Sequence, residues 1–383
     1  MKRLARAYQT VGLLLLNTLL LLLLVEGCAR LALALRPPAP SLAQRVASFK
    51  EGMLRLSYYA GQEWARAYWD EHMAAAVNWT YEPYVLWHTQ PFSGQYINID
   101  AQGMRRTPGS TCTESSYRIF VFGGSTVWGY GVPDDNTLPA YLQAGLPHNV
   151  CVRNYGELGY NSTQSLLRLL RLLQAGDVPD MVLFVQGSND VMVAQRTSSA
   201  GSAFYDAQMA RAIDSSSGLI ASDGAAANPL RDWLRSTATY RLLLGAPQTI
   251  EDAVWAQPPF DPAFVSGIVD TYLANWRAAQ ALADEYGFVF LAFTQPVLPL
   301  VGRPYTDEEQ RFIWDTPGGL VELFRAVYPR IAAGLPAGRF YYWANVLDGQ
   351  TLPMWIDFVH LTAWGNLALA AEILREIVPL AAP

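Results

Sequence analysis

The stretch IFVFGGSTVWGYG, residues 119–131, contains a serine placed where it could act as a nucleophile. A short apolar run that fits a buried strand leads directly into Gly123, Gly124 and Ser125. Paired glycines let the backbone turn sharply and let a substrate approach it closely. A serine between a strand and a helix is, however, also a favoured helix N-cap. The stretch by itself leaves both interpretations of Ser125 open.

Histidine is the side chain best suited to activate such a serine, because its unperturbed pKa of about 6.5 lies near neutral pH. The chain contains four histidines. His72, His88 and His148 lie in a helical stretch, among aromatic residues and in a turn before a strand, respectively. His360 lies in WIDFVHLTAWGN, three residues after Asp357 and just before an expected helix. His360 is therefore the preferred candidate for the general base.

Asp357 and His360 are spaced so that they can interact. In a turn that leads into a helix, residues three apart point to the same side, so the carboxylate can reach one ring nitrogen and fix the tautomer. The other ring nitrogen is then free to take a proton from serine. Alone, the D-x-x-H pattern is weak, because an aspartate that caps a helix near a surface histidine gives the same spacing.

Two further turns follow expected strands and carry possible oxyanion donors. NYGELGYNS supplies Gly159, and VQGSND supplies Asn189. A tetrahedral acyl intermediate needs N–H donors aimed at its oxyanion. The backbone N–H groups of Ser125 and Gly159, with the Asn189 amide, could supply three. A tight turn at Gly159 and an Asx turn at Asn189 are the alternatives.

Short apolar runs alternate with helical patterns around these residues. Near-continuous apolar strands separated by helices predict a parallel sheet covered on both faces, with ligands bound at the carboxyl ends of its strands. The third strand is expected to end in a polar turn. We predict strands within residues 117–123, 149–156, 179–190, 288–297 and 339–348, and helices within residues 137–146, 162–176, 264–287, 320–335 and 362–378.

Four blocks, FGGST, NYGELGYNS, GSND and DFVH, together resemble the SGNH hydrolase superfamily, also called GDSL-like esterases and lipases. The resemblance spans about residues 117–375. It implies a flavodoxin-like three-layer α/β sandwich with a five-stranded parallel sheet, and neither metal nor other cofactor. It implies that Ser125 is the nucleophile, that His360 is the general base and then acid, and that Asp357 orients it. Gly159 and Asn189 would be oxyanion donors.

The sequence departs from the family pattern in two places. The first block reads GGST instead of GDSL, which looks like a subset with membrane-anchored members. The gap between the third and fourth blocks is long and contains an insertion at about residues 192–262, rich in Ser, Ala, Gly and Asp. Such a segment suits a mobile lid or an ordinary surface excursion.

The amino terminus predicts a membrane anchor. Cationic residues precede an apolar run, residues 11–25, that reaches spanning length when it continues through EGCARLALAL. Because the cationic residues precede the apolar run and few follow it, we predict that the amino terminus lies in the cytoplasm and that the rest of the chain is exported. A cleaved signal peptide is disfavoured because no A-x-A-like site follows the run, and LVEGC only loosely resembles a lipoprotein site at Cys28. We divide the chain into an anchor at 1–35, a membrane-proximal extension at 36–110 and a hydrolase domain at 111–383.

Composition excludes some classes of protein. A hydrophobic fraction of 51% supports a large core, and a net charge of −6 shows no basic surplus of the kind that nucleic-acid binding needs. Twelve tryptophans and twenty tyrosines fit a carbohydrate or lipid surface or a well-packed core. Cys112 falls just before one expected strand and Cys151 opens the next. If these strands are parallel neighbours, an exported location permits a disulfide between them, but two unpaired thiols are equally compatible.

The sequence favours a membrane-anchored serine esterase with its catalytic domain on the periplasmic or extracellular side. The expected substrate is an acyl, foremost acetyl, ester of an envelope carbohydrate or lipid. An O-acyltransferase that uses the same acyl-serine chemistry, and an inactive binding or assembly protein of the same fold, are the alternatives.

Overall fold

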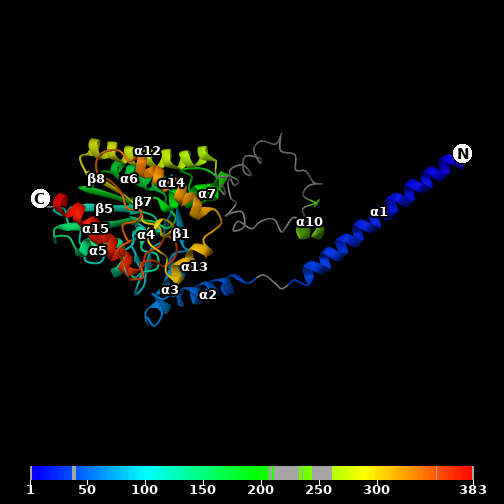
Figure 1. Ribbon diagram of the computed structural model, residues 1–383, viewed down its shortest axis with the longest axis horizontal. Helices are drawn as coiled ribbons and strands as arrows, with labels where there is room; N and C mark the ends of the chain where they lie inside the picture. Colours follow the sequence, from blue (N-terminus) through cyan, green and yellow to red (C-terminus); the bar gives the residue numbers. More distant parts are fainter. Residues whose placement is uncertain are drawn as a thin grey trace. The chain divides into compact units, whose positions relative to one another are not determined.

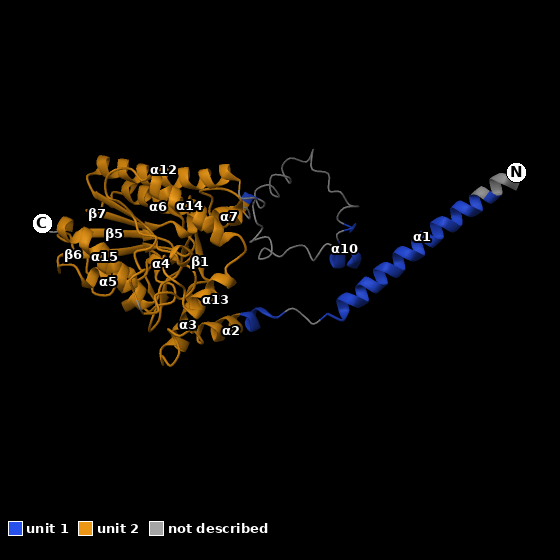
Figure 2. Ribbon diagram, viewed as in Figure 1, with its two compact units in different colours: residues 1–45, 210–254 blue, residues 46–209, 255–383 orange. Residues whose placement is uncertain are grey.

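The computed structural model describes residues 2–36, 40–206, 209–210, 233–234, 236–243, 261–350 and 352–381. Two compact units divide the chain, and we describe each by itself (Figure 2). The first comprises residues 1–45 and 210–254, and the second comprises residues 46–209 and 255–383.

The first unit contains the long apolar helix α1, Lys2–Ala34. Within the described residues, its part from Tyr8 to Ala34 is the one helix long and apolar enough to cross a membrane, and nearly all of its leucines are exposed. The short helix α10, Ala238–Leu243, packs against it. The Glu26 carboxylate of α1 accepts the backbone N–H groups of Ala238 and Thr239 at 2.8 and 2.9 Å, which satisfies donors that the start of α10 would otherwise leave free.

The second unit is built around a five-stranded parallel sheet with the order β6-β5-β7-β8-β9. Taken in chain order this is 2-1-3-4-5, the flavodoxin-like doubly wound arrangement. The predicted α/β class and five-stranded sheet are therefore confirmed. The strands are β5 (Tyr117–Gly123), β6 (Val150–Gly156), β7 (Met181–Gln186), β8 (Val289–Thr294) and β9 (Phe340–Tyr342).

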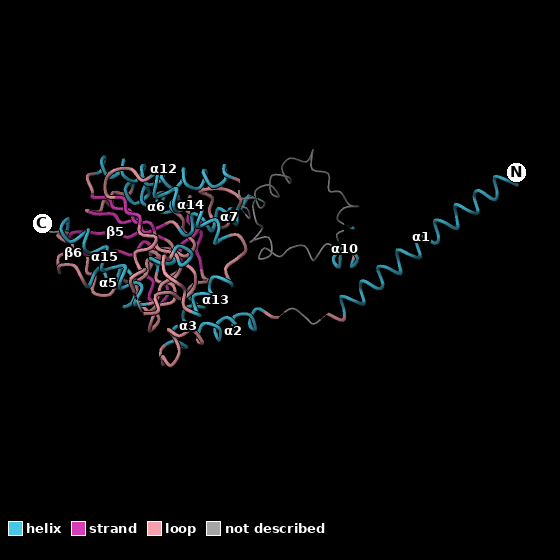
Figure 3. The backbone as a smooth tube through the Cα atoms, viewed as in Figure 1, coloured by secondary structure: helices cyan, strands magenta, loops and turns pink. Residues whose placement is uncertain are grey.

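Helices cover both faces of this sheet (Figures 1 and 3). Alternate residues of β5 enter different cores, because successive side chains of a strand point to opposite faces. Phe120 and Phe122 pack with one group of helices, and Ile119 and Val121 pack with the other. The first group is α6 (Ser162–Gln174), α7 (Ser188–Thr197), α12 (Pro262–Tyr286) and α14 (Leu320–Gly334); the second is α5 (Leu138–Ala144) and α15 (Ala363–Ala381).

The extension was expected to contain a helical stretch followed by an irregular aromatic one, and the aromatic part has more regular structure than expected. Helices α2 (Leu42–Met53) and α3 (Ala65–Ala75) match the helical stretch. The aromatic part, however, forms two antiparallel pairs, β1 (Trp79–Glu82) with β2 (Leu86–Thr89) and β3 (Phe92–Ser93) with β4 (Asn98–Ile99). Strands of two to four residues are too short to show the alternation by which a sequence reveals a strand.

Two boundaries near the site also differ from expectation. The GSND block does not form a polar turn after β7, because Gly187, at φ 133°, leads directly into α7 at Ser188. Helix α7 continues to Thr197, so the first residues of the expected insertion are helical. Most of the rest of the expected insertion lies outside the described residues, namely 207–208, 211–232, 235 and 244–260. The prediction that this insertion could act as a lid therefore falls on residues that are not described. The remaining elements are α4 (Ser125–Trp128), α13 (Asp307–Asp315) and the 3-10 turns η1 (Asp134–Asn136) and η2 (Leu298–Leu300).

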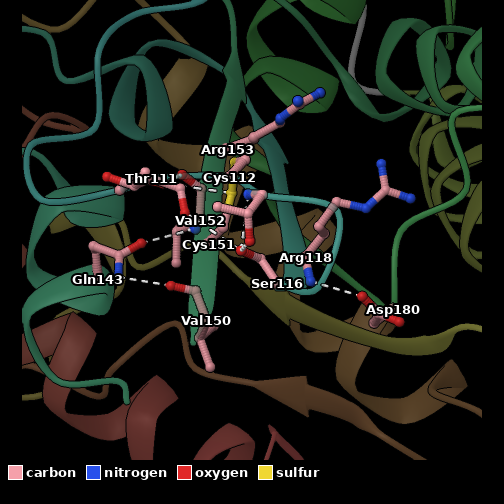
Figure 4. The surroundings of a disulfide bond; sticks show 12 residues. Thr111, Cys112, Ser116, Arg118, Gln143, Val150, Cys151, Val152, Arg153 and Asp180 are labelled. Atoms are coloured by element: carbon pink, nitrogen blue, oxygen red, sulfur yellow. Dashed lines mark hydrogen bonds between the residues drawn. A yellow bond between two sulfur atoms is a disulfide. The ribbon is translucent and has the colours of Figure 1, made fainter. Parts of the chain in front are cut away.

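A disulfide joins Cys112 to Cys151, with Cα atoms 5.2 Å apart (Figure 4). Cys151 lies in β6, directly beside Arg118 of β5 in the sheet register, so the two strands begin side by side as expected. The bridge closes the segment that enters β5 onto the neighbouring strand, whereas Cys28 of α1 is unpaired. Of the two alternatives for the body cysteines, the disulfide is the one that forms.

Candidate active site

Ser125, His360 and Asp357 form a chain of hydrogen bonds. The Ser125 Oγ lies 2.7 Å from the His360 Nε2, and the His360 Nδ1 lies 2.6 Å from the Asp357 Oδ2. The carboxylate can therefore hold the proton of His360 on Nδ1, which leaves Nε2 to accept the proton of the serine hydroxyl. Asp357 and His360 are three residues apart in the sequence, and Ser125 precedes both by more than 230 residues. The structure brings all three together.

Ser125 begins the short helix α4 at the end of β5, but it does not act as a cap. Gly124 occupies the N-cap position and makes no side-chain cap hydrogen bond. A Cβ atom at Gly124 would lie 2.3 Å from the Asn189 Nδ2 and 3.0 Å from the Tyr160 carbonyl oxygen. Glycine before Ser125 is therefore required by the close approach of Asn189, and the hydroxyl of Ser125 is left for His360.

The position of β5 explains why Ser125 lies at a ligand-binding edge. One neighbour of β5 is the strand that follows it, β6, and the other is β7, so the direction of winding reverses at this strand. Ligands of doubly wound sheets bind at this topological switch point, outside the carboxyl ends of the strands. Gly159 follows β6 and Asn189 follows β7, which places both beside Ser125.

A tight loop presents Asp357 to His360. The Asp357 Oδ1 accepts the backbone N–H groups of Val359 and His360, each at 2.8 Å, and the Ile356 N–H donates to the His360 carbonyl at 2.9 Å. Burial opposes the charged form of Asp357. The His360 ring and the two backbone donors outweigh it and hold the pKa of this carboxyl below its ordinary value. Asp357 is consequently ionised at neutral pH.

Gly159 and Asn189, the two expected oxyanion donors, line the same cavity as Ser125. Gly159 has a φ of 80°, a left-handed conformation that favours glycine. Among the described residues, no partner accepts the backbone N–H of Ser125 or of Gly159. The Asn189 Nδ2 donates to the Tyr160 carbonyl at 2.8 Å, which fixes the amide and leaves its second hydrogen available. Ser125, Gly159 and Asn189 all line one cavity.

The cavity beside Ser125 has a volume of about 300 Å³ and a mostly apolar lining. Trp79 and Trp87 of the extension face Tyr205, with ring centroids 5.5 and 5.2 Å from it. The extension, expected only to be near the membrane, therefore supplies part of the wall. The remaining lining residues are His72, Ala76, Ser125, Tyr130, Leu158, Gly159, Asn189, Met192, Val193, Arg196, Phe204, Val359 and His360.

Buried hydrogen bonds fix the extension to the loop that carries Gly159. The Glu157 carboxylate accepts the Thr89 and Leu158 backbone N–H groups at 2.8 and 2.9 Å. The Trp87 indole N–H donates to the Leu158 carbonyl at 3.1 Å. The wall and the oxyanion side of the cavity are consequently held as one assembly.

Two ring-bearing residues at the site were not found by sequence reasoning. The Tyr130 ring stacks on His360, with centroids 4.0 Å apart at 24°, and His72 packs edge-on against Tyr130 at 4.8 Å. His72, set aside as part of an extension helix, thus lines the cavity. Burial lowers the pKa of His72 to about 3, so its ring is neutral and packs as a hydrophobic residue. Tyr130 lies just past the end of α4, five residues after Ser125, and nothing in the local sequence indicates its contact with His360.

Sequence reasoning also missed Arg196, although its spacing from Asn189 places both residues on one face of α7. Asn189, Met192, Val193 and Arg196 follow an i, i+3, i+4, i+7 pattern, which places them on one face of a helix. Reading GSND as a turn hid this face. Within the described residues, no group of three or more histidine, cysteine or acidic side chains is arranged to hold a metal ion.

Comparison with known proteins gives matches among solved structures only. No protein-family model matches the chain, and no curated protein does so. A carbohydrate acetylesterase family member from Sinorhizobium meliloti aligns with 69% of this chain and 98% of its own, at 16% identity and a TM-score of 0.37. A member of the lipolytic protein G-D-S-L family from Veillonella parvula aligns with 67% and 96%, at 13% identity and a TM-score of 0.39. A putative arylesterase from Agrobacterium tumefaciens aligns with 68% and 97%, at 18% identity and a TM-score of 0.35. Function therefore has to be inferred from the geometry of the site itself.

Proposed function

We propose that the chain is a serine ester hydrolase with Ser125 as its nucleophile. The observation that carries the proposal is the continuous hydrogen-bond chain from Ser125 through His360 to Asp357, with distances of 2.7 and 2.6 Å. If Ser125 served only as a helix cap, it would need no histidine beside it. If His360 were only a surface histidine, it would need no contact with a serine. Three donors beside the nucleophile match the needs of acyl transfer.

The proposed reaction has two stages. The Ser125 Oγ attacks the ester carbonyl carbon while His360 Nε2 takes the hydroxyl proton, and the N–H groups of Ser125, Gly159 and Asn189 bind the oxyanion. The tetrahedral intermediate collapses, and the leaving alcohol takes the proton from His360. Water then attacks the acyl-serine with the same base, which releases the acid and restores Ser125. Asp357 stays ionised throughout and stabilises the imidazolium.

We further propose that this domain acts outside the cytoplasm on an acylated glycan or lipid of the envelope. Helix α1 would anchor the chain, with the cationic residues before its apolar run on the inner side. The Cys112–Cys151 disulfide supports an oxidising compartment for the body. The aromatic wall of the cavity supports a substrate that presents an apolar face to it.

Hydrolysis of 4-nitrophenyl acetate by the full-length chain in detergent tests the proposal. We expect turnover in the wild type and a loss of at least about 10⁴-fold in Ser125→Ala. Ser93→Ala, an exposed serine in β3, is the matched control and should behave as the wild type. A fluorophosphonate should label Ser125, read by peptide mass spectrometry. Full activity in Ser125→Ala would refute the mechanism, and a wild type inactive toward short and long esters would favour a binding protein.

A further inference from the structure

Among the described residues, Arg196 is the one arginine that lines the cavity beside Ser125. It lies on the same face of α7 as Asn189, seven residues further along the helix. At a rise of 1.5 Å per residue the two Cα atoms are separated by about 10 Å along the axis. Both side chains line the same cavity. Met192 and Val193 line the cavity between them.

The guanidinium of Arg196 has an aromatic partner but no acidic one. Its Cζ lies 3.3 Å from the ring centroid of Phe204. In the part of the chain that the structure describes, no carboxylate forms an ion pair with Arg196 and no carbonyl accepts from it. Buried Arg105 differs in this respect, because it pairs with Asp134 at 2.9 Å and donates to three backbone carbonyls.

Within the described residues, none of the five N–H donors of Arg196 has an acceptor, so these donors can serve a ligand. Burial lowers the pKa of Arg196 to about 10, which leaves it charged at neutral pH but less well solvated than a surface arginine. A half-buried cation in an apolar wall is costly unless an anion compensates it. Arginine suits carboxylate and phosphate oxyanions because its planar fork can bind two oxygens at once.

The rest of the wall explains what separates the anion from the ester. Trp79, Trp87 and Tyr205 supply flat apolar surfaces to the same cavity that Ser125 and Arg196 line. A substrate that fills it would have a polar ester at Ser125, an apolar segment in the middle and an acidic group at Arg196. A neutral acyl chain would satisfy the middle of the cavity but not its far end.

We propose that Arg196 binds an oxyanion of the substrate, a carboxylate or phosphate group carried roughly 10 Å from the scissile carbonyl across an apolar segment. This inference rests on the proposed esterase function and defines the substrate class as acidic esters. Arg196 is a specificity-determining residue and takes no part in proton transfer.

Matched pairs of esters test the inference on the full-length chain. On the acyl side, the 4-nitrophenyl monoester of suberic acid is compared with 4-nitrophenyl octanoate. On the alcohol side, 4-acetoxybenzoate is compared with 4-acetoxybenzamide. We expect kcat/KM for the acidic member of at least one pair to exceed that of its neutral partner by about tenfold. The pair that shows the preference identifies which side of the ester carries the anion.

Variants then assign the preference to Arg196. Arg196→Gln should lower the acid-to-neutral ratio about tenfold, mainly through KM, and Arg196→Lys should recover part of it because the positive charge remains. Added salt should reduce the wild-type ratio. Arg330→Gln, at an exposed position of α14 outside the cavity, is the charge-matched control and should leave the ratio unchanged.

The outcomes separate this inference from the esterase proposal. Hydrolysis of both members of each pair at equal rates, or an unchanged ratio in Arg196→Gln, would overturn the anion site and leave the esterase intact. A ratio that falls equally in Arg330→Gln would also overturn it. Absence of hydrolysis of every ester would remove the esterase proposal itself.

Discussion

The two ends of the cavity are held by different kinds of contact. At the Ser125 end, directional hydrogen bonds of 2.6 to 2.8 Å join His360, Asp357 and Asn189 to fixed partners of the α/β body. At the Arg196 end, ring contacts predominate, with centroid separations of 5.2 to 5.5 Å between Tyr205 and the tryptophans of the extension. Hydrogen bonds fix atoms to within a fraction of an ångström, as chemistry requires, whereas ring packing tolerates changes of shape. We infer that the first end determines the reaction and the second determines the substrate.

The largest effects should come from the two partners of Ser125. We expect His360→Ala to lower kcat by at least about 10⁴-fold, and Asp357→Asn by between about 10² and 10⁴-fold. An asparagine can still accept the Val359 and His360 N–H groups, but its NH₂ group favours the tautomer that cannot accept the serine proton. His88→Ala, in the β1–β2 pair, is the control. Steady-state kinetics on 4-nitrophenyl acetate measure both, and a normal Asp357→Asn would exclude the aspartate from the triad.

Removal of the Asn189 amide should have the next largest effect. We expect Asn189→Ala to lower kcat by about 10² to 10³-fold, or roughly 3 kcal/mol, with little change in KM, because the lost donor acts on the transition state. Asn189→Asp should be at least as harmful, since a carboxylate would repel the oxyanion. A change confined to KM would show instead that Asn189 only shapes the cavity.

The placement of a residue could be predicted from the sequence where the residue lies next to a recognisable strand. It could not be predicted where the placement depends on packing between distant segments. Ser125, Gly159 and Asn189 each follow a strand whose apolar run is visible, so their positions at one sheet edge could be deduced. His360 could be chosen because Asp357 lies three residues before it. Such reasoning missed Tyr130, because an aromatic next to a glycine has no local signature for stacking on a histidine 230 positions away.

The wall of the cavity was missed for a related reason. Strands β1 and β2 have four residues each, too few for a periodic pattern, and the contact of Thr89 in β2 with Glu157 joins segments far apart in the sequence. Arg196 belongs to a helix whose first turn coincides with a block that reads equally well as a turn. In both cases the deciding contacts are between segments far apart in the chain, which a single sequence does not reveal.

The hydrogen-bonded end also contains a buried carboxylate that should make stability depend on pH. Asp190, next to Asn189, accepts the Ser162 backbone N–H at 3.2 Å. Burial outweighs the hydrogen bonds from Ser162 and raises the pKa of Asp190 from 3.8 to about 6. The folded state therefore binds this proton more tightly than the unfolded state. The associated stability is fully present below about pH 4 and is lost as the pH rises through 6, a loss of roughly 3 kcal/mol.

Asp190→Asn removes that titration without removing the acceptor. Between pH 4 and pH 7, the free energy of unfolding of Asp190→Asn should rise relative to the wild type by up to roughly 3 kcal/mol. Urea unfolding of both proteins at each pH measures the difference, in which other titrating groups cancel. Parallel pH profiles would show that Asp190 is not the sensitive group, and the hydrogen-bonded end would then be no more dependent on pH than the aromatic end.

The smallest effect is expected at the aromatic end, where it should alter preference and not chemistry. Trp79→Leu removes one ring that faces Tyr205 and widens the cavity. We expect the ratio of kcat/KM for 4-nitrophenyl hexanoate to that for the acetate to fall about tenfold, because the lost apolar contact serves the longer chain more than the acetyl group. Trp314→Leu, at a position that is 74% exposed and outside the cavity, is the matched control. If Trp79→Leu instead lowered kcat/KM equally for the hexanoate and the acetate, the Trp79 ring would be supporting the Ser125 end. The two ends would then not have separate roles in reaction and substrate preference.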